Sequence, residues 1–458
     1  MKKFRFGSRS LTFFAILFVG AMIGTSFIGT VPSEAATSTI AYTVYKDSSG
    51  YTCAKNAATG VVDIRSTTSY LVIQKAVDKS SGKSVLIKAG TYDISRTIYT
   101  GSTSITGEGN GTVLKATTAV RGAMILVTNN YYKADGTKAS TARPNGVTIS
   151  NLNIDGNRAV RTSGIMEGVG MINALNCNIY RVYSHDIIGG QGFYMSNSQY
   201  CSIKNSWVYN IGSSAYANYG SGIAFGEASS TKVASSNILI ENCLISKVSM
   251  SSIDLEPANH VTIKNCVFRE AMTWNGWPTP VITVYAIYGY AANDYVTITG
   301  CNAYGAFGEF FIMTPSNYCV ISNNIITYTA GLKVALYAAN SHDNKITGNV
   351  IKTVSTNAIQ MVNCKNFLVE GNTVTDSTTS KSDYGIRFYE SSGTSANNII
   401  KKNTVTGFRY AITSNTGSDY ATVQYNVVKS SYCGLFLSGT HNVKTSNTLN
   451  GAYDWVSA

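Results

Sequence analysis

A strand-turn-strand pattern recurs roughly every 22–30 residues through most of the chain, and no other feature constrains the fold as strongly. Apolar and polar residues alternate within each unit, which predicts strands with one face buried and one face outward. A unit this short cannot bury its apolar face alone, so successive units are expected to stack around a continuous core. Stacked short strands joined by tight turns predict an all-β, parallel β-helix of about a dozen coils. The second strand of the unit is represented by VTISNLNI (147–154), CSIKNSWV (201–208), ILIENCLI (238–245), VTIKNCVF (261–268) and CVISNNII (319–326).

Asparagine or glycine recurs at one position within these second strands. Both residue types tolerate the left-handed backbone conformation, so a tight turn is expected at this position in each coil. Stacked asparagine side chains can also hydrogen-bond along the stack. Arg181 departs from the pattern and indicates a special turn. The matching positions are Asn151, Asn205, Asn242, Asn265, Asn323, Gly300 and Gly371.

The cysteines fall on the same repeat. Their number, nine, is odd, which argues against a complete disulfide framework. A column of small, soft side chains fits the interior of a stack, so we expect buried free thiols, with one or more disulfides as the alternative. No Cys or His spacing predicts a zinc site. Three cysteines begin second strands (Cys177, Cys201 and Cys319), and three follow the turn position (Cys243, Cys266 and Cys301).

The amino-terminal segment has the features of an export signal. Lys2, Lys3 and Arg5 precede an apolar run at 11–28, and Ala35 fits a cleavage site. An uncleaved anchor is the alternative, because the apolar run is long enough to span a bilayer. We therefore expect a secreted, extracellular protein that has no contact with a membrane once the signal is cleaved.

The predicted organisation is a signal peptide at 1–35, an amino-terminal segment at 36–65 and one β-helix domain at 66–458. Apolar residues at helical spacing within 70–79 predict a short amphipathic helix. The open end of a β-helix exposes core and strand edges, so this helix is expected to cap the first coil.

The charge balance permits an anionic partner. The formal net charge is +12, and removal of residues 1–35 takes away four basic residues and one acidic residue, leaving 12 − 3 = +9. Only 13% of residues are charged and no dense basic run occurs, which argues against nucleic acid. A polysaccharide partner, including an acidic one, is compatible with this composition.

Three segments at the start of the repeat resemble a known superfamily. They are SVLIKAGTYDIS (84–95), TSITGEGNGTVLKA (103–116) and VTISNLNIDGNR (147–158). They resemble the right-handed parallel β-helix superfamily of pectate lyases, polygalacturonase-like hydrolases and alginate epimerases. The resemblance implies a right-handed helix and carbohydrate polymers as the class of substrate. The catalytic motifs of those families are absent, and the coil that corresponds to the epimerase motif has the sequence GFYMSNS (192–198), with no acid or histidine.

Two carboxylates stand out in the segment SSIDLEPANH (251–260). Because Ile253 and Leu255 are expected to point inward, Asp254 and Glu256 should both point outward. Their Cα atoms should lie about 6.6 Å apart, which suits an inverting glycosidase with one acid and one base. A calcium or structural role and a plain solvated surface are the alternatives.

Other residues of this outward face are predicted to bind substrate, since aromatic rings stack on sugars. The histidines His260 and His342 fall in equivalent turns, which favours a role in the turn. His185 and Asp186 are a candidate second site. The predicted substrate-binding residues are Tyr194, Tyr285, Tyr337, Arg387, Tyr389 and Glu227.

These features favour a secreted polysaccharide-degrading enzyme, a glycoside hydrolase that uses the acid pair. The first alternative is a lyase or C5-epimerase acting on a uronic acid polymer, which needs a base and a cation or arginine at the substrate carboxylate. The second is a non-catalytic carbohydrate-binding surface protein, since fold does not dictate function. No metal or cofactor is expected for the hydrolase, whereas a lyase is compatible with calcium.

Overall fold

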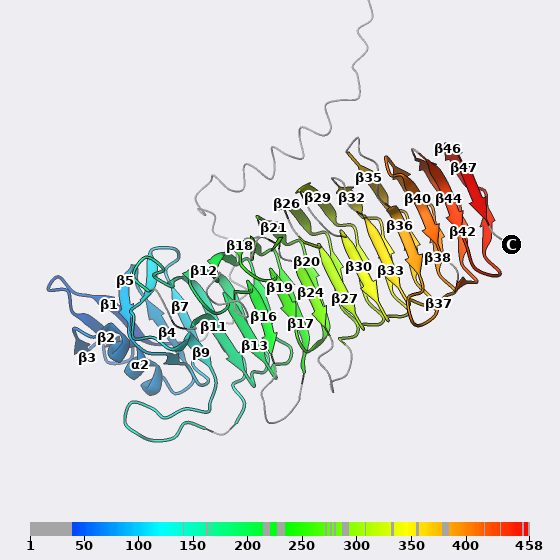
Figure 1. Ribbon diagram of the computed structural model, residues 1–458. Helices are drawn as coiled ribbons and strands as arrows, with labels where there is room; N and C mark the ends of the chain where they lie inside the picture. The colour runs from blue at the N-terminus through cyan, green and yellow to red at the C-terminus, as the bar shows by residue number, and fades with distance from the viewer. Residues whose placement is uncertain are drawn as a thin grey trace, which may run out of the picture. The chain divides into compact units, whose positions relative to one another are not determined.

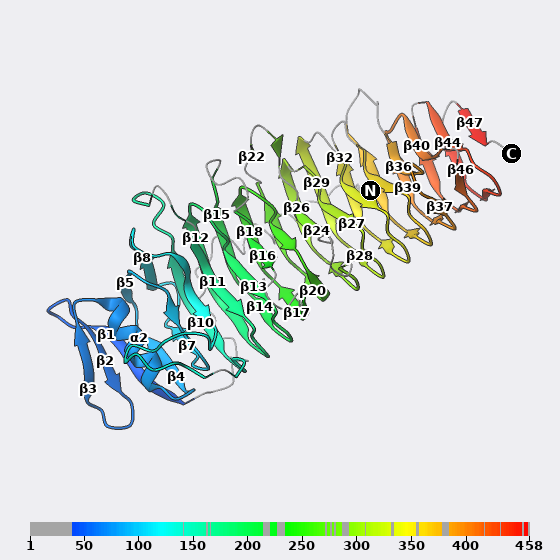
Figure 2. The same ribbon diagram turned by 60° about the horizontal axis from the view of Figure 1, so that its bottom comes forward.

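The chain winds through stacked coils of short parallel strands (Figures 1 and 2). The computed structural model describes residues 39–458 except 141, 162–163, 165, 214–219, 227–233, 271–272, 275–276, 279–280, 286–292, 307, 331–333, 354–356, 378–383, 416, 431, 451–452 and 457–458. The expected export signal and Glu227 therefore lie outside the described residues. No helix in the described part is long and apolar enough to cross a membrane.

One sheet takes one strand from each coil and carries the candidate site. It has 14 strands, which pair in parallel in the order of the coils. These strands are the first strands of the sequence repeat. They are β6 (Ile98–Tyr99), β9 (Gly122–Val127), β11 (Met166–Ile172), β13 (Phe193–Ser196), β16 (Ile223–Gly226), β19 (Ile253–Leu255), β24 (Ile282–Tyr285), β27 (Phe311–Thr314), β30 (Leu336–Ala339), β33 (Ile359–Val362), β36 (Tyr384–Tyr389), β40 (Tyr410–Ser414), β44 (Cys433–Leu437) and β47 (Tyr453–Val456).

A 29-stranded sheet forms the rest of the wall in two rows. The first row follows the 14-stranded sheet along the chain. It contains β4 (Ser84–Ile87), β7 (Ile105–Gly107), β10 (Thr148–Asp155), β12 (Asn178–Ile187), β14 (Ser202–Lys204), β17 (Ser235–Glu241), β20 (Ala258–Lys264), β25 (Thr297–Thr299), β28 (Val320–Ser322), β31 (Lys345–Thr347), β34 (Leu368–Glu370), β38 (Ile399–Lys401), β42 (Thr422–Gln424) and β45 (Val443–Thr445).

The second row completes each coil, with β10 and β12 long enough to belong to both rows. It contains β5 (Gly90–Ile94), β8 (Thr112–Ala116), β15 (Trp207–Ile211), β18 (Leu244–Val248), β21 (Val267–Arg269), β26 (Asn302–Ala306), β29 (Ile325–Ala330), β32 (Val350–Thr353), β35 (Thr373–Asp376), β39 (Thr404–Thr406), β43 (Val427–Lys429) and β46 (Thr448–Asn450). Two separate small pairs are β22 (Thr273–Trp274) with β23 (Trp277–Pro278) and β37 (Ser395–Ala396) with β41 (Ser418–Asp419).

The second strand predicted from the repeat is two strands, because the backbone turns between the rows. Asn205 has a φ of 51° and separates β14 from β15, and Asn265 has a φ of 54° between β20 and β21. The predicted left-handed turn is thus confirmed. Arg181 adopts the same conformation, with a φ of 52°, inside the long strand β12.

The amino-terminal end of the coils is covered as predicted. Helix α2 (Ser69–Lys79) buries Val72, Ile73, Ala76 and Val77 in the common core. Strands β1 (Ile40–Lys46), β2 (Thr52–Asn56) and β3 (Val62–Ser66) pair antiparallel, and β1 also pairs in parallel with β4. The helix and these strands close the apolar end of the stack.

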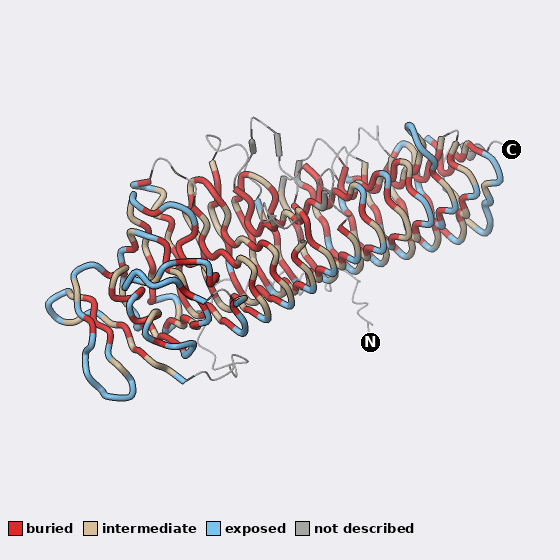
Figure 3. Tube along the Cα trace, turned by 90° about the horizontal axis from the view of Figure 1, so that it is seen from below, coloured by how far each residue is buried: buried red, intermediate tan, exposed pale blue. Residues whose placement is uncertain are grey.

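The interior is a continuous file of apolar side chains, and buried positions alternate with accessible ones along the coils (Figure 3). All nine cysteines are buried and free, which confirms the prediction of unpaired thiols. Burial removes a thiol from water and so favours its neutral form. It raises the pKa of Cys319 and the pKa of Cys364 to about 12.

A buried ladder of asparagine amides continues the cysteine column toward the carboxyl terminus. Each side-chain Nδ2 donates to the Oδ1 of the next member over 2.9–3.0 Å. The ladder lies one residue after the left-handed turn, whereas the sequence pattern placed hydrogen-bonded asparagines at the turn itself. Its members are Asn324, Asn349, Asn372, Asn403, Asn426 and Asn447.

Candidate functional site

The register of the 14-stranded sheet aligns outward side chains from successive coils into columns. Asp254 on β19 lies between Ala224 on β16 and Thr283 on β24. The same column continues to Tyr194 in one direction and to Ile312 in the other. Because residues two apart on a strand share a face, Glu256 belongs to the next outward column.

Asp254 is partly buried and lies next to polar groups. Its neighbours Ile253 and Leu255 are fully buried in the core, so its side chain projects to the other face of the strand, as predicted. The Thr283 hydroxyl donates to Asp254 Oδ1 over 2.6 Å. Burial raises the pKa of Asp254, while hydrogen bonds from Thr283 and Ser221 act in the opposite direction.

Glu256 follows the end of β19 and remains partly accessible. Burial, and then the charge of Asp254, raise its pKa to about 7. A carboxyl group with this pKa carries a proton for about half of the time near neutral pH, as a general acid or base requires. The peptide bond between Glu256 and Pro257 is cis.

Tyr194 is brought toward the acid pair by a glycine. A Cβ atom built on Gly226 would overlap the phenol group of Tyr194, so the ring crosses the Gly226 backbone. Phe225 pairs with Leu255, which places Gly226 and Glu256 at successive positions of one column. The absence of a side chain at Gly226 therefore gives the Tyr194 phenol access to this part of the face.

The remaining predicted binding residues lie farther along the same sheet. Tyr337 is three coils from Asp254 in the same column, about 14 Å away at the usual strand spacing. Arg387 is five coils away, about 24 Å, so the structure does not bring it to the acid pair. Tyr285 belongs to β24, but its side chain lies outside the described residues.

Arg387 and Tyr389 form a small cluster of their own. The Arg387 guanidinium lies 4.3 Å from the Tyr389 ring centroid and 4.5 Å from that of Tyr384. Gln360 Nε2 donates to the Tyr389 hydroxyl over 2.9 Å. This arrangement offers a planar cation and a phenol to a ligand that extends along the sheet.

Three residues that support the face were not assigned a role from the sequence. Thr283 and Ser221 are the hydroxyl partners of Asp254, and Glu167 on β11 is a further carboxylate whose pKa burial raises. The alternation of β24 places Thr283 in the outward column, so its position was predictable. Ser221 lies just before β16 and outside any strand, and no periodicity indicates where such a side chain points.

One group of potential metal ligands occurs among the described residues. Ligand atoms of Asp155, His185 and Asp186 lie within 4.8 Å of one another. Both His185 ring nitrogens already have partners, Nδ1 with Asp186 at 2.7 Å and Nε2 with Asn153 at 2.7 Å. Protein groups therefore already engage both nitrogens of His185, and Asp155 contacts Lys115 and the Asn157 amide instead.

Two family models each match part of the chain. Residues 65–277 match the model described as rhamnogalacturonase A/epimerase, pectate lyase-like, and residues 292–455 match the periplasmic copper-binding protein (NosD) model. Within the described part of 292–455, no three His, Cys, Asp or Glu side chains approach closely enough to share an ion. The described residues of this segment therefore offer no such three-ligand site for copper. No curated protein matches the chain.

Solved structures share the fold at low sequence identity. The A-module of the Azotobacter vinelandii mannuronan C-5 epimerase AlgE6 is 15% identical, with a TM-score of 0.56 over 85% of this chain and 93% of that one. The tailspike of Pseudomonas phage phi297 is 10% identical, with a TM-score of 0.53 over 82% and 73%. The amino-terminal fragment of bacteriophage Phi29 gene product 12 is 15% identical, with a TM-score of 0.50 over 83% and 69%.

The architecture is that of a parallel β-helix solenoid. The two family models and the structural neighbours agree on its class. The chain belongs to the right-handed parallel β-helix superfamily, as its amino-terminal repeats predicted.

Proposed function

We propose that this protein is a secreted polysaccharide-degrading enzyme, a glycoside hydrolase that uses Asp254 and Glu256. The observation that carries the proposal is the acid pair itself. Two carboxyl groups share the outer face of one strand, and partial burial raises the pKa of both. A solvated surface pair would not show this upward shift, because burial is its largest cause and solvated carboxylates are not buried.

The two acids have environments that suit different roles. Hydroxyl donors stabilise the Asp254 carboxylate, whereas Glu256 has a pKa of about 7 and supplies a proton. In an inverting hydrolysis, Asp254 takes a proton from water as the water oxygen attacks the anomeric carbon. The glycosidic bond breaks at the same time, and its oxygen receives the Glu256 proton. The Cα separation of about 6.6 Å is compatible with the carboxyl spacing of about 6.5–9.5 Å used by inverting enzymes.

A substrate along the sheet would meet the predicted binding residues in order. Tyr194 lies near the acids, Tyr337 about three coils away, and Arg387 with Tyr389 about five coils away. An extended polysaccharide matches this spacing, whereas a monosaccharide does not. The Arg387 cation favours a polymer that carries acidic sugars.

A lyase or C5-epimerase acting on a uronic acid polymer is the second candidate. The rhamnogalacturonase A/epimerase model covers the segment that contains the acid pair. A Glu256 pKa of about 7 also suits a base that removes the proton beside a sugar carboxylate. The distance of Arg387 from the acids counts against it, because Arg387 cannot neutralise a carboxylate at that point. A calcium ion bound with the substrate would have to neutralise that carboxylate instead.

Export is part of this proposal. The basic and apolar amino-terminal segment is the sequence feature that supports it, and a polymer substrate outside the cell requires it.

The test is a panel of polysaccharides incubated with the mature protein, reading reducing ends and unsaturated-product absorbance together. New reducing ends without absorbance, abolished by Asp254→Asn and by Glu256→Gln, are the expected result. The matched control Glu270→Gln changes an exposed carboxylate and should leave turnover unchanged. Absorbance that disappears with a chelator would assign a calcium-dependent lyase. Retention on one polymer without any product would assign a binding protein.

A further inference from the structure

A second feature of the surface lies at the turn between the 14-stranded sheet and the first row of the 29-stranded sheet. One residue per coil takes a left-handed backbone conformation there, and its amide donates to the equivalent turn of the next coil. Asparagine or aspartate occupies some coils, while tyrosine or histidine occupies others. The column contains Asn176, Tyr200, Asn237, His260, Tyr295, Tyr318, Asp343, Asn366, Asn397, Tyr420 and His441.

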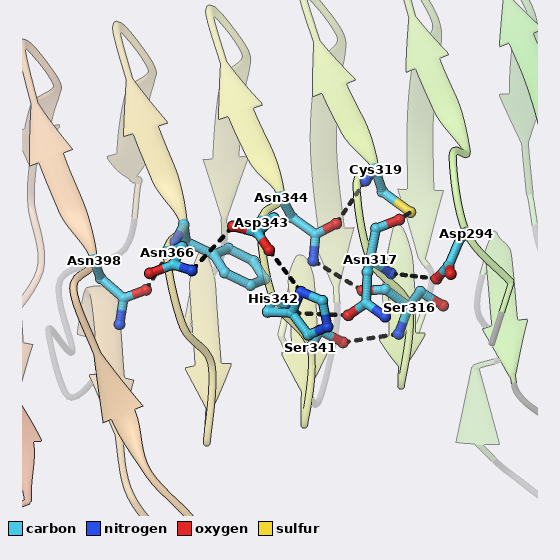
Figure 4. A network of polar contacts seen from close by, with 11 residues as sticks. Asp294, Ser316, Asn317, Cys319, Ser341, His342, Asp343, Asn344, Asn366 and Asn398 are labelled. Carbon is cyan, nitrogen blue, oxygen red and sulfur yellow. Dashed lines mark hydrogen bonds and ion pairs between the residues drawn. The ribbon is translucent and has the colours of Figure 1, made fainter.

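The tyrosines of this column are conformationally unfavourable. Left-handed backbone suits asparagine and is a genuine outlier for a large ring, so the turn alone does not call for tyrosine. The rings are also exposed, with 47% of Tyr295 and 45% of Tyr318 accessible. Their neighbours form a polar network that fixes the turn, in which Asp294 accepts from Asn317 and Asn317 accepts from His342 (Figure 4).

The rings stack from coil to coil, and the stack ends at His260. The His260 and Tyr295 centroids are 4.6 Å apart, and those of Tyr295 and Tyr318 are 5.1 Å apart. The next member of the column is the small Asn237, followed by the exposed Tyr200. Tyr295 therefore covers one face of the His260 imidazole. The other face is on the side of the Asn237 turn.

A groove of about 520 Å³ lies beside the Asn237 turn and the His260 ring. A flat group that stacks on the His260 face there makes carbon contacts of about 3.5–4.0 Å. Residues that line the groove include Asn237, Leu239, His260, Thr262, Lys264 and Tyr295.

The floor of the groove presents hydrogen-bonding groups beside the ring face. Lys264 Nζ lies 2.9 Å from Glu241 Oε1, so an ammonium and a carboxylate are held side by side on adjacent strands. The ammonium has further protons to donate, and the carboxylate and the Thr262 hydroxyl can accept. An apolar ring face next to paired donors and acceptors matches the two-sided chemistry of a pyranose.

We propose that this groove is a second carbohydrate-binding site, which stacks one sugar ring of a polysaccharide on the free face of His260. His260 follows Glu256 by four residues, so the groove lies around the corner from the acid pair, within about 14 Å of chain. The inference takes from the proposed function only the class of ligand. It does not require the acid pair to be catalytic.

The test is affinity electrophoresis of the mature protein, with Asp254→Asn as the background so that no polymer is consumed. The gels contain polygalacturonate, alginate, rhamnogalacturonan or neutral xylan. His260→Asn removes the ring, and Asn237→Tyr places a second ring beside the face of His260 that Tyr295 leaves free. Both substitutions use residues that this turn already holds in other coils, so thermal melting should show folded proteins. The expected result is about fivefold weaker retention for each variant on the polymer that retards the background protein.

The matched control is His441→Asn, which removes a histidine stacked 4.6 Å from Tyr420 at the same turn and should leave retention unchanged. Unchanged retention of both groove variants, or retention of the background protein by none of the four polymers, would overturn the proposal. If Asp254→Asn abolishes turnover but the groove variants are retained as strongly as the background protein, the hydrolase proposal holds and the groove proposal fails. If the groove variants are retained more weakly but the wild type shows no turnover, the groove proposal holds and the hydrolase proposal fails.

Discussion

Glu256 should make the folded protein less stable as the pH rises, and Glu256→Gln should remove that effect. The folded-state pKa is about 7, against 4.5 for an ordinary glutamate. Between these two values the folded state holds a proton that the unfolded state has lost. Stability therefore falls as the pH rises from about 4.5 to about 7 and remains lower above that range.

The size of the effect follows from the shift in pKa. At 1.36 kcal/mol per pKa unit, 2.5 units correspond to about 3.4 kcal/mol. Solvent reaches part of the Glu256 side chain, so screening should reduce this to about 1–2 kcal/mol. An unfolding entropy of about 2.1 cal/mol/K per residue over roughly 420 residues converts that energy into a change in melting temperature of about 1–2 °C.

Differential scanning calorimetry at one scan rate checks the prediction. Glu256→Gln should melt about 1–2 °C above the wild type at pH 8, and the two should coincide near pH 4.5. Glu270→Gln, which changes an exposed carboxylate, should show no such pH dependence. An equal difference at both pH values, or a Glu256→Gln protein that is less stable at pH 8, would refute the reasoning that the carboxyl is destabilised by its surroundings.

Three further predictions concern the acid pair and the core. Hydrolysis should fall about tenfold per pH unit above about 7, because Glu256 must hold its proton, and a flat profile of kcat/KM to pH 9 would contradict this role. Thr283→Val removes a hydroxyl donor from the Asp254 carboxylate and should move the acidic limb of the profile to higher pH, with recovery in Thr283→Ser. Asn372→Leu interrupts the buried amide ladder and should cost roughly 2–4 kcal/mol, which urea denaturation would report; a loss below about 1 kcal/mol would show that the neighbours find other partners.

The repeat predicted most of the fold because its physical basis is local. Alternation decides which side chain of β19 points inward, and stacking is the way such units bury an apolar face. The turn at Asn205 and the capping helix were likewise predictable from residues that tolerate left-handed backbone or follow helical spacing. The division of the second strand into two rows was not predictable, because the alternation of apolar and polar residues continues on both sides of the turn.

The candidate site was predictable in part. The outward direction of Asp254 and Glu256 follows from the alternation of their own strand. The passage of Tyr194 over Gly226 and the hydroxyl of Ser221 near Asp254 depend on neighbouring coils and on turns, whose lengths vary along the chain. The groove at His260 is lined by residues of two neighbouring coils, including Asn237, so it depends on the register between them.

The class of fold, the face of each strand and the burial of unpaired cysteines can be read from the sequence, because each depends on short-range periodicity. The number of coils between Arg387 and Asp254, and the hydroxyls that contact that acid, follow from the packing of the coils. The Glu256 pKa of about 7 also follows from this packing. These properties depend on the register between coils and on exclusion of water, and both arise only when distant segments of the chain pack together.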